Sequence, residues 1–166
     1  MDKGTSNRTV LKTVLKAFIP HSRENTMLAF KPGQFFNHLD YIEKVSGANR
    51  ATISSTISRA KRAGLLKTDD RGNLQTTWRG KLKVPSLPNR KIRNHMVIIF
   101  DIPEHSRNKR DLFRRYLQST GAEQVQKSVW KTQYDIYNDV LSAIKDLEIV
   151  DYVSLFMADE ISKTTG

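Results

Sequence analysis

The chain of 166 residues is 38% hydrophobic and 27% charged, with a formal net charge of +11 at pH 7, which fits a globular protein of one or two domains. It contains no cysteine, which excludes disulfides, zinc fingers and thiol catalysis, and its four histidines lack the spacing of a transition-metal site. The longest purely apolar stretch, residues 96–100, is far shorter than the roughly 20 residues that span a bilayer. We therefore expect a cytoplasmic protein with no membrane partner.

The positive charge is concentrated in one part of the chain. Residues 1–94 hold 19 Lys and Arg against 6 Asp and Glu, a balance of +13, whereas residues 95–166 hold 9 against 11, a balance of −2. Solubility alone gives no reason for such segregation, but binding to a polyanion does, because phosphates must be neutralised by cations. The charge distribution therefore predicts a basic, polyanion-binding part joined to a nearly neutral part.

The first elements in chain order are helices. Apolar residues at helical spacing predict one helix over 10–18, which Pro20 stops, and a second helix over 34–44. Gly47 then suits a tight turn between two helices, because glycine adopts positive φ without strain.

A third helix, expected over 50–63, is the most informative segment of the first half. Asn49 precedes it as a good N-cap, able to accept hydrogen bonds from the amides of the first turn. Three aliphatic residues lie within roughly 60° of one another on its inner face: Ile53, Ile57 and Ala60. The rest of the helix has small, polar or cationic residues and no acidic one, so its backbone could enter a DNA groove closely. These outward residues are Ala51, Thr52, Ser55, Ser58, Arg59 and Arg62.

A hairpin is expected after this helix. Gly64 ends the helix, and the segments LLKT and NLQTT flank the turn DDRG, which predicts two short strands. The stretch SGANRATISSTISRAKRAGLL resembles the winged helix-turn-helix family in its turn glycine, capping residue, inward aliphatic residues and terminal Gly-Leu-Leu. The resemblance implies a DNA-binding domain over 1–83, with Lys67 and Arg71 on the wing. A winged helix that contacts a protein partner is the alternative.

Residues 84–94 are predicted to be a basic linker. The segment carries two prolines, each of which fixes its own φ and pushes the preceding residue toward extended geometry, so a helix cannot continue through it. It ends with a cluster of three cations, Arg90, Lys91 and Arg93.

The second half alternates strand and helix signals. Val and Ile over 96–100 predict a buried strand, and a helix that Ser106 caps follows and stops at Gly121. The segment AEQVQKSVWKT predicts two short strands or one bulged pair, and a second helix and a final strand, DYVSLFMAD, complete the chain. The order βαββαβ predicts a ferredoxin-like domain over 95–166, so the expected fold class is α+β.

A narrower resemblance covers this half. The stretch VIIFDIPEHSRNKRDLFRRYLQSTGAEQVQKSVW is similar to the central domain of the phenylacetate-catabolism repressor family, PaaX, which is itself similar to the small CRISPR-associated Cas-two family. The shared marks are a strand ending in Phe-Asp-Ile-Pro-Glu, an Arg-rich helix and a Gln-x-Ser-Val-Trp hairpin at 126–130. Because a winged helix precedes it, the layout favours the repressor family, and the resemblance implies that this half pairs two copies. Family members usually continue into a C-terminal domain that senses an acyl-CoA effector, whereas this chain stops at Gly166, so its effector stays unknown.

Asp101 follows the first strand of the second half, where a metal-binding carboxylate could stand. In Cas-two proteins the matching aspartate is drawn from both subunits of a dimer to hold a divalent cation, which makes phosphodiester hydrolysis conceivable here. No His or second carboxylate stands at an evident fixed spacing to act as a base. We expect Asp101 to end the strand and to accept hydrogen bonds from Arg107, Arg110 or the start of the helix, and the protein not to be an enzyme.

Together these features predict a sequence-specific regulator of transcription in a prokaryotic cytoplasm, on the nucleoid when bound. It would be a repressor that binds double-stranded DNA as a homodimer, without a cofactor, at inverted half-sites spaced by a multiple of about one helical turn (~10 bp). The expected DNA-contacting residues are Asn49, Arg50, Ala51, Thr52, Ser55, Ser58, Arg59, Lys61, Arg62, Lys67, Arg71, Arg90, Lys91 and Arg93. The alternatives are a Cas-two-like nuclease that uses Mg²⁺ or Mn²⁺ at Asp101 and a non-catalytic adaptor in CRISPR spacer acquisition.

Overall fold

The computed structural model describes residues 3–19, 34–84, 88 and 90–159, with the backbone alone for 3–6 and 34–36. The chain forms two compact units, residues 1–86 and 87–166, and each is a fold of its own. Of the helices described, none is long and apolar enough to cross a membrane.

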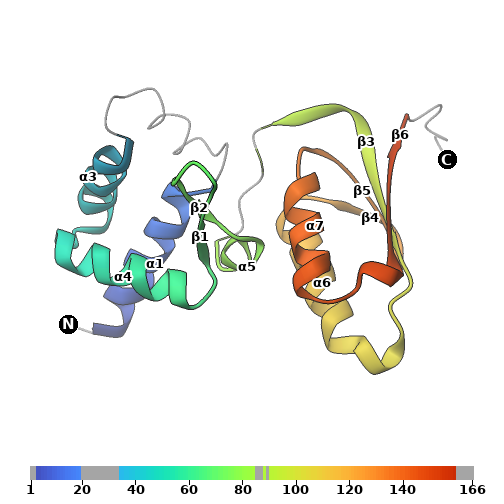
Figure 1. Ribbon diagram of the computed structural model, residues 1–166, viewed down its shortest axis with the longest axis horizontal. Coiled ribbons are helices and arrows are strands. Elements are labelled where there is room, and N and C mark those ends of the chain that lie inside the picture. Colours follow the sequence, from blue (N-terminus) through green and yellow to red (C-terminus); the bar gives the residue numbers. More distant parts are fainter. Residues whose placement is uncertain (1–2, 20–33, 85–87, 89, 160–166) are drawn as a thin grey trace. The chain divides into compact units, whose positions relative to one another are not determined.

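Within the part of the first unit that the structure describes, three helices surround one apolar core before the hairpin (Figure 1). They are α1 (Lys3–Ala17), α3 (Gln34–Ser46) and α4 (Arg50–Arg62). Each helix contributes side chains that are wholly excluded from solvent, among them Val14, Leu15, Ile42 and Ile53. The helical spacing of apolar residues predicted these three faces, and the structure packs them against one another; Pro20, the predicted stop of the first helix, lies outside the described residues.

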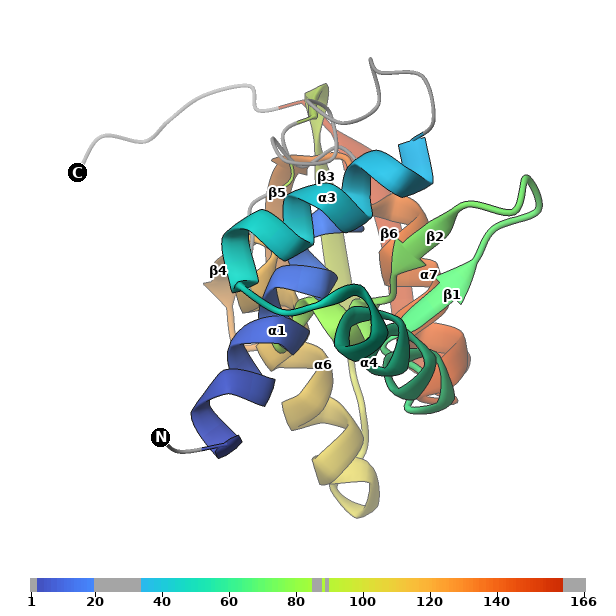
Figure 2. The same ribbon diagram turned by 90° about the vertical axis from the view of Figure 1, so that its left-hand side faces the viewer.

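A two-stranded hairpin follows α4, as the sequence predicted. Strands β1 (Leu66–Thr68) and β2 (Leu74–Thr76) pair antiparallel, and the hairpin projects beside α4 (Figure 2). Thr76 fastens the hairpin to the end of α1: its backbone amide donates to the Phe18 carbonyl at 2.8 Å, and its hydroxyl donates to the Leu15 carbonyl at 2.7 Å. Because both bonds join residues that are far apart in the chain, they fix the hairpin relative to the helices.

One short helix, α5 (Trp78–Lys81), closes the unit and was not predicted. The Thr77 hydroxyl caps it by accepting from the Gly80 amide at 3.2 Å. Gly80 lies so close to the preceding hairpin that a Cβ atom there would stand 2.3 Å from the Leu65 carbonyl oxygen. The position therefore admits only glycine without a shift of the backbone.

The second unit has the predicted order βαββαβ. Its strands are β3 (Lys91–Phe100), β4 (Glu123–Gln126), β5 (Val129–Tyr134) and β6 (Val153–Ala158). Its helices are α6 (Arg107–Ser119) and α7 (Tyr137–Asp146), with single 3₁₀ turns η1 (Glu104–Ser106) and η2 (Val150–Tyr152). The sheet order is β4-β5-β3-β6, every neighbouring pair is antiparallel, and the register of β4 against β5 shifts between Gln124 and Gln126, which is the predicted bulge.

Both helices of the second unit cover the same face of the sheet (Figure 1). Phe113 of α6 meets Phe100 of β3 edge-on, with ring centroids 5.4 Å apart, and Trp130 of β5 is buried on the same face. The opposite face, the open face of the sheet, carries residues that alternate with these. Across it Val97 of β3 pairs with Phe156 of β6, and Ile99 pairs with Val129 of β5.

Two local predictions for this unit are wrong. Strand β3 begins at Lys91 and not at Met96, so the last four residues of the predicted linker, 91–94, belong to the sheet, where Lys91 pairs with Tyr134. The cations there were mistaken for a linker signal, but an antiparallel strand can carry charged residues on its exposed positions, as Lys91 and Arg93 are. Ser106 stands at the start of α6, yet its side chain makes no capping hydrogen bond.

Candidate nucleic-acid interface

Helix α4 is held at both ends by local chemistry. Gly47 adopts a φ of 66° in the turn after α3, a conformation that a residue with a Cβ atom disfavours. The Asn49 side chain then accepts from the Thr52 amide at 2.9 Å, which confirms the predicted N-cap. At the other end the helix gives way to Gly64, which has a φ of 67°. The sequence therefore fixes where this helix begins, where it ends and which side is buried.

The outward side of α4 is exposed and free of acidic residues. Four buried residues, Ile53, Thr56, Ile57 and Ala60, define the inner side. The predicted outward residues Ala51, Ser55, Ser58 and Arg62 are all exposed, as is Arg59, and Thr52 is half-buried. Ser54 is exposed as well, and the prediction missed it although it lies one turn before Ser58 on the same side of the helix.

The cations around α4 differ in how they are engaged. Arg50 forms ion pairs with two acidic residues of α3, Asp40 and Glu43, the latter at 3.5 Å, so its charge is largely compensated. Lys61 lies on the same flank and donates to the Thr68 hydroxyl of β1 at 3.0 Å. Arg62 is exposed at the centre of the outward side.

The opposite flank of α4 faces α1. There the Arg59 guanidinium donates to the Thr56 hydroxyl at 3.2 Å while remaining exposed. Arg59 is thus already oriented by a neighbour on its own helix.

The hairpin turn is organised by Asp69. Its carboxylate accepts from the backbone amides of Asn73 and Arg71, at 2.8 Å and 3.0 Å, and from the side chains of Asn73 and Gln75. The hydrogen bond from the Asn73 amide is the main cause that lowers the pKa of Asp69 below its ordinary value. The carboxylate is occupied within the turn, which leaves Arg71 exposed at the tip beside Asp70.

The three cations of the predicted linker belong to the second unit. Arg90 is in an ion pair with Asp135 at 3.2 Å, and its carbonyl accepts from the Asp135 amide. The Lys91 ammonium lies 5.8 Å from the centre of the Tyr134 ring, and Arg93 is exposed on β3. If these three cations contact DNA, the contact is therefore made by the surface of the second unit.

Asp101 is exposed just after β3, and its backbone amide donates to the Tyr152 carbonyl at 2.9 Å. The prediction that Arg107 or Arg110 holds its side chain is wrong. Arg110 donates to Glu104 at 2.9 Å and to the Ile102 carbonyl at 3.3 Å, and Arg107 pairs with Glu104 and Asp111. Glu104 is within reach of both arginines because it is the first residue of the 3₁₀ turn directly before α6.

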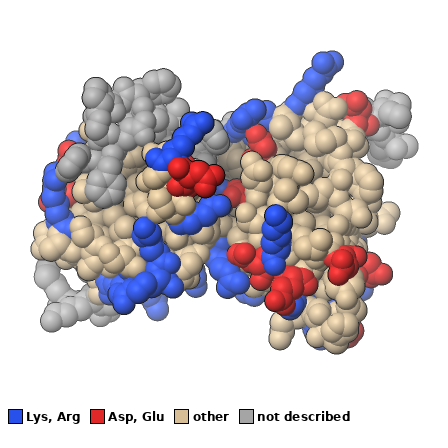
Figure 3. Space-filling model, viewed as in Figure 1, with Lys and Arg blue, Asp and Glu red and all other residues tan. Residues whose placement is uncertain are grey.

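The surface charge follows this division. In the view of Figure 3, Lys and Arg gather over the end of α4 and the start of the hairpin, where the key colours them blue. The hairpin tip shows red flanked by blue, in keeping with the acidic residues of the turn. On the second unit red and blue patches alternate.

The sheet order, the antiparallel pairing and the two helices on one face place the second unit in the class of ferredoxin-like domains. Residues 93–166 match the family described as the PaaX protein central Cas2-like domain. This part of the chain is therefore similar to the PaaX central Cas2-like domain, which confirms the PaaX-like resemblance predicted from the sequence. The match lies within the second unit. Neither a curated protein nor a solved structure matches the chain.

Proposed function

We propose that this protein is a sequence-specific DNA-binding regulator of transcription, a repressor that acts as a homodimer on an inverted-repeat operator. The observation that carries the proposal is the outward side of α4: an exposed helical surface of small, polar and cationic residues with no carboxylate. Such a surface suits the major groove, because small side chains allow close approach and the absence of carboxylates avoids repulsion by phosphates.

The first unit acts as a winged helix-turn-helix domain in this proposal. The order of α3, a short glycine turn, α4 and a hairpin matches that motif, in which the second helix enters the major groove. Ala51, Thr52, Ser55 and Arg59 lie nearest to the bases, with Ser54 and Ser58 beside them. Asn49 caps the helix and contributes mainly by positioning its first turn.

Phosphate contacts come from the cations around this helix. Arg62 and Lys67 are exposed, and Lys61 needs to break only one exposed hydrogen bond, to Thr68, in order to reach a phosphate. Arg71 extends from the hairpin tip. Arg50 contributes less, because Asp40 and Glu43 already compensate its charge. Arg90, Lys91 and Arg93 supply weaker, sequence-independent contacts.

The second unit joins two copies through the open face of its sheet. This face exposes Phe156 by 53% and Ile99 by 41%, and their strands are neighbours, so the two apolar side chains belong to one patch. A two-fold axis through such a patch buries it against its own copy, which is the self-complementary arrangement of most homodimers. The two first units then bind two inverted half-sites, and repression follows when the operator overlaps a promoter.

Selection of bound duplexes from a random library, with the full chain as bait, tests this proposal. We expect an inverted repeat whose half-sites are spaced by about one helical turn or a multiple (~10 bp). A footprint on DNA that flanks the protein's own gene then places the operator.

A matched pair of variants connects the result to α4. Ser55→Glu puts a carboxylate on the outward side and should lower duplex affinity at least about tenfold, because it repels phosphates and blocks close approach. Gln118→Glu makes the same change of charge on an exposed position of α6 and should leave affinity within about twofold. Equal effects of the two substitutions, or no enriched sequence, would reject the assignment of α4.

A further inference from the structure

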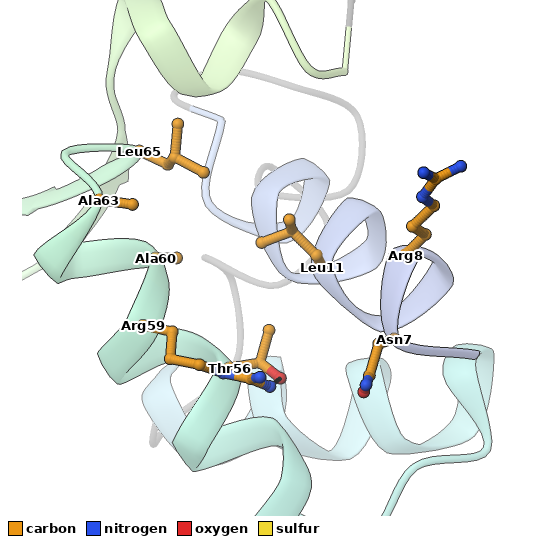
Figure 4. A pocket seen from close by; sticks show the side chains of 8 residues that line it. All are labelled: Asn7, Arg8, Leu11, Thr56, Arg59, Ala60, Ala63 and Leu65. Atoms are coloured by element: carbon orange, nitrogen blue, oxygen red, sulfur yellow. Dashed lines mark hydrogen bonds between the residues drawn. The ribbon is translucent and has the colours of Figure 1, made fainter. Parts of the chain in front are cut away.

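A pocket of about 280 Å³ lies in the first unit where α1, α4 and the start of β1 meet (Figure 4). It is lined by Asn7, Arg8 and Leu11 of α1, by Thr56, Arg59, Ala60 and Ala63 of the α4 segment, and by Leu65. The pocket exists because α4 presents two alanines, Ala60 and Ala63, toward the Leu11 side chain, and these small residues do not fill the space between the helices.

The inner wall of the pocket is apolar. Leu11, Ala60, Ala63 and Leu65 surround its middle in Figure 4. Among the described residues of the wall, Thr56 has the one hydroxyl, which is already engaged, since it donates to the Thr52 carbonyl at 2.8 Å and accepts from Arg59. A hydrocarbon group can therefore occupy the pocket without leaving a buried polar group unpaired.

One edge of the pocket is cationic. The side chain of Arg59, an exposed residue, extends from α4 across Thr56, and Arg8 stands on the α1 wall. None of the described residues that line the pocket carries a carboxylate. A guanidinium beside an apolar hollow of this size matches a ligand of about ten non-hydrogen atoms that has a hydrocarbon body and a carboxylate at one end.

We propose that this pocket binds a small amphipathic organic anion, with the hydrocarbon body against Leu11, Ala60 and Ala63 and the carboxylate on Arg59. The consequence for DNA rests on the proposed function, in which Arg59 lies near the bases. A carboxylate that holds Arg59 withdraws it from DNA, so the anion and the duplex weaken each other's binding, by the same factor in both directions.

Octanoate, octanamide and acetate are suitable probes for the free, ¹⁵N-labelled full chain. Octanoate has both the hydrocarbon body and the charge, octanamide lacks the charge, and acetate lacks the body. We expect octanoate to shift the amide signals of Leu11, Thr56 and Ala60. Octanamide should bind about tenfold more weakly, because it loses the charge-assisted hydrogen bond, and acetate should bind more than about 100-fold more weakly.

Three variants make the test specific to the pocket. Ala63→Leu adds apolar volume at an exposed lining position outside the proposed DNA contacts, and should abolish octanoate binding. Arg59→Gln should weaken octanoate about tenfold, whereas Arg62→Gln, the same loss of charge on a residue that does not line the pocket, should not. If octanoate shifts no lining amide, if octanamide binds as well as octanoate, or if the two arginine variants behave alike, the proposal is overturned.

The link to DNA is measured separately. Saturating octanoate should lower the affinity for the selected duplex about tenfold in the native chain and not in Ala63→Leu, with sodium chloride added to the same ionic strength as the control. An unchanged affinity in the native chain would overturn the link. A chain that binds octanoate as expected but binds no duplex would reject the proposed function and leave the pocket assigned.

Discussion

Helices α4 and α6 carry similar numbers of cations but differ in how those cations are engaged. Helix α6 has five Lys and Arg residues and one Asp, whereas α4 has four and no acidic residue. In α6 most of the cations work inside the second unit: Arg110 ties down Glu104, and Arg114 donates to the Lys127 carbonyl in the β4–β5 turn. In α4 three of the four, Arg59, Lys61 and Arg62, are exposed and make no ion pair with a described residue.

The difference lies in where the carboxylates are. Those near α6 are placed within reach of its cations, as in the pairs Lys109–Glu148 at 2.9 Å and Arg114–Asp111 at 3.8 Å. Of the described residues, the two carboxylates that pair with a cation of α4 are Asp40 and Glu43 of α3, and both engage Arg50. Exposed ion pairs contribute little to stability, but they cancel the field that a polyanion would feel. The comparison therefore supports the proposal that the first unit, and not the second, binds the polyanion.

The largest expected effect that tests this difference between the units is the salt dependence of duplex binding. If the first unit neutralises six or more phosphates, affinity should fall by about 10³ or more between 50 and 200 mM salt, because condensed counterions are released on binding. Fluorescence anisotropy of a labelled duplex over a salt series measures the slope. A flat profile would mean that the unpaired cations around α4 do not contact phosphates.

A substitution of Gly80 tests whether the two units are independent in folding as they are in charge. In Gly80→Ala the new Cβ would stand 2.3 Å from the Leu65 carbonyl oxygen and 2.6 Å from Thr76 Cγ2. We therefore expect the free energy of unfolding to fall by about 3 kcal/mol for the first unit and to stay the same for the second. Each unit has one tryptophan, Trp78 and Trp130, so ¹⁹F NMR of fluorotryptophan-labelled protein in urea follows each unit separately.

In that experiment the Trp78 signal should unfold at lower urea while the Trp130 signal keeps its midpoint. Gly72→Ala is the control, because its Cβ would meet nothing within 4 Å and only the φ of 84° is strained, at about 1 kcal/mol. Parallel shifts of both tryptophan signals in Gly80→Ala would show that the units fold as one.

The proposed role of the second unit in joining two copies is tested at Phe156. Phe156→Asp places a charge at the centre of the proposed dimer patch and should weaken the homodimer about 30-fold, as truncation of a central aromatic residue does. Analytical ultracentrifugation measures the dissociation constant. Tyr137→Asp is the matched control, because Tyr137 is as exposed, at 51%, but stands at the start of α7. A dimer that tolerates Phe156→Asp uses another surface.

Within the first unit, substitutions of Arg59 and Arg71 should affect DNA binding in different ways. Arg59→Ala should change the ranking of operator variants by about tenfold, because Arg59 is assigned to a base, whereas Arg71→Ala should weaken all duplexes about equally. Binding of a set of single-base operator variants distinguishes the two outcomes, with Arg115→Ala on α6 as the control for lost charge. The placement of α4 in the groove fails if Arg71→Ala changes the ranking as much as Arg59→Ala does.

Much of the fold was accessible from the sequence because its signals are local. The extent of α4 follows from the Asn49 cap, the apolar spacing and Gly64, and the order βαββαβ follows from alternating strand and helix patterns. Helix α5 was missed because a single turn has little periodicity, and it is fixed by a close approach of Gly80 to Leu65, which lie 15 residues apart.

The parts of the site that could not be predicted depend on packing. The pairing of Arg50 with Asp40 needs the angle between α3 and α4, and the pocket beside Arg59 needs the distance between α1 and α4. In the same way, Glu104 precedes Arg110 by six residues, and Asp101 lies three residues before Glu104. Spacing alone therefore did not show which of the two carboxylates would pair with Arg110.

We expect Asp101 to contribute neither to DNA binding nor to catalysis. Asp101→Ala should leave duplex affinity and operator preference unchanged. Neither the native chain nor this variant should cleave labelled DNA or RNA with Mg²⁺ or Mn²⁺. The physical reason lies in Glu104, the nearest carboxylate in sequence, which is held by Arg107 and Arg110 and is thereby kept from sharing a cation with Asp101. Metal-dependent cleavage that disappears in Asp101→Ala would show that the second unit is a nuclease. That result would reject the proposal that the second unit only joins two copies.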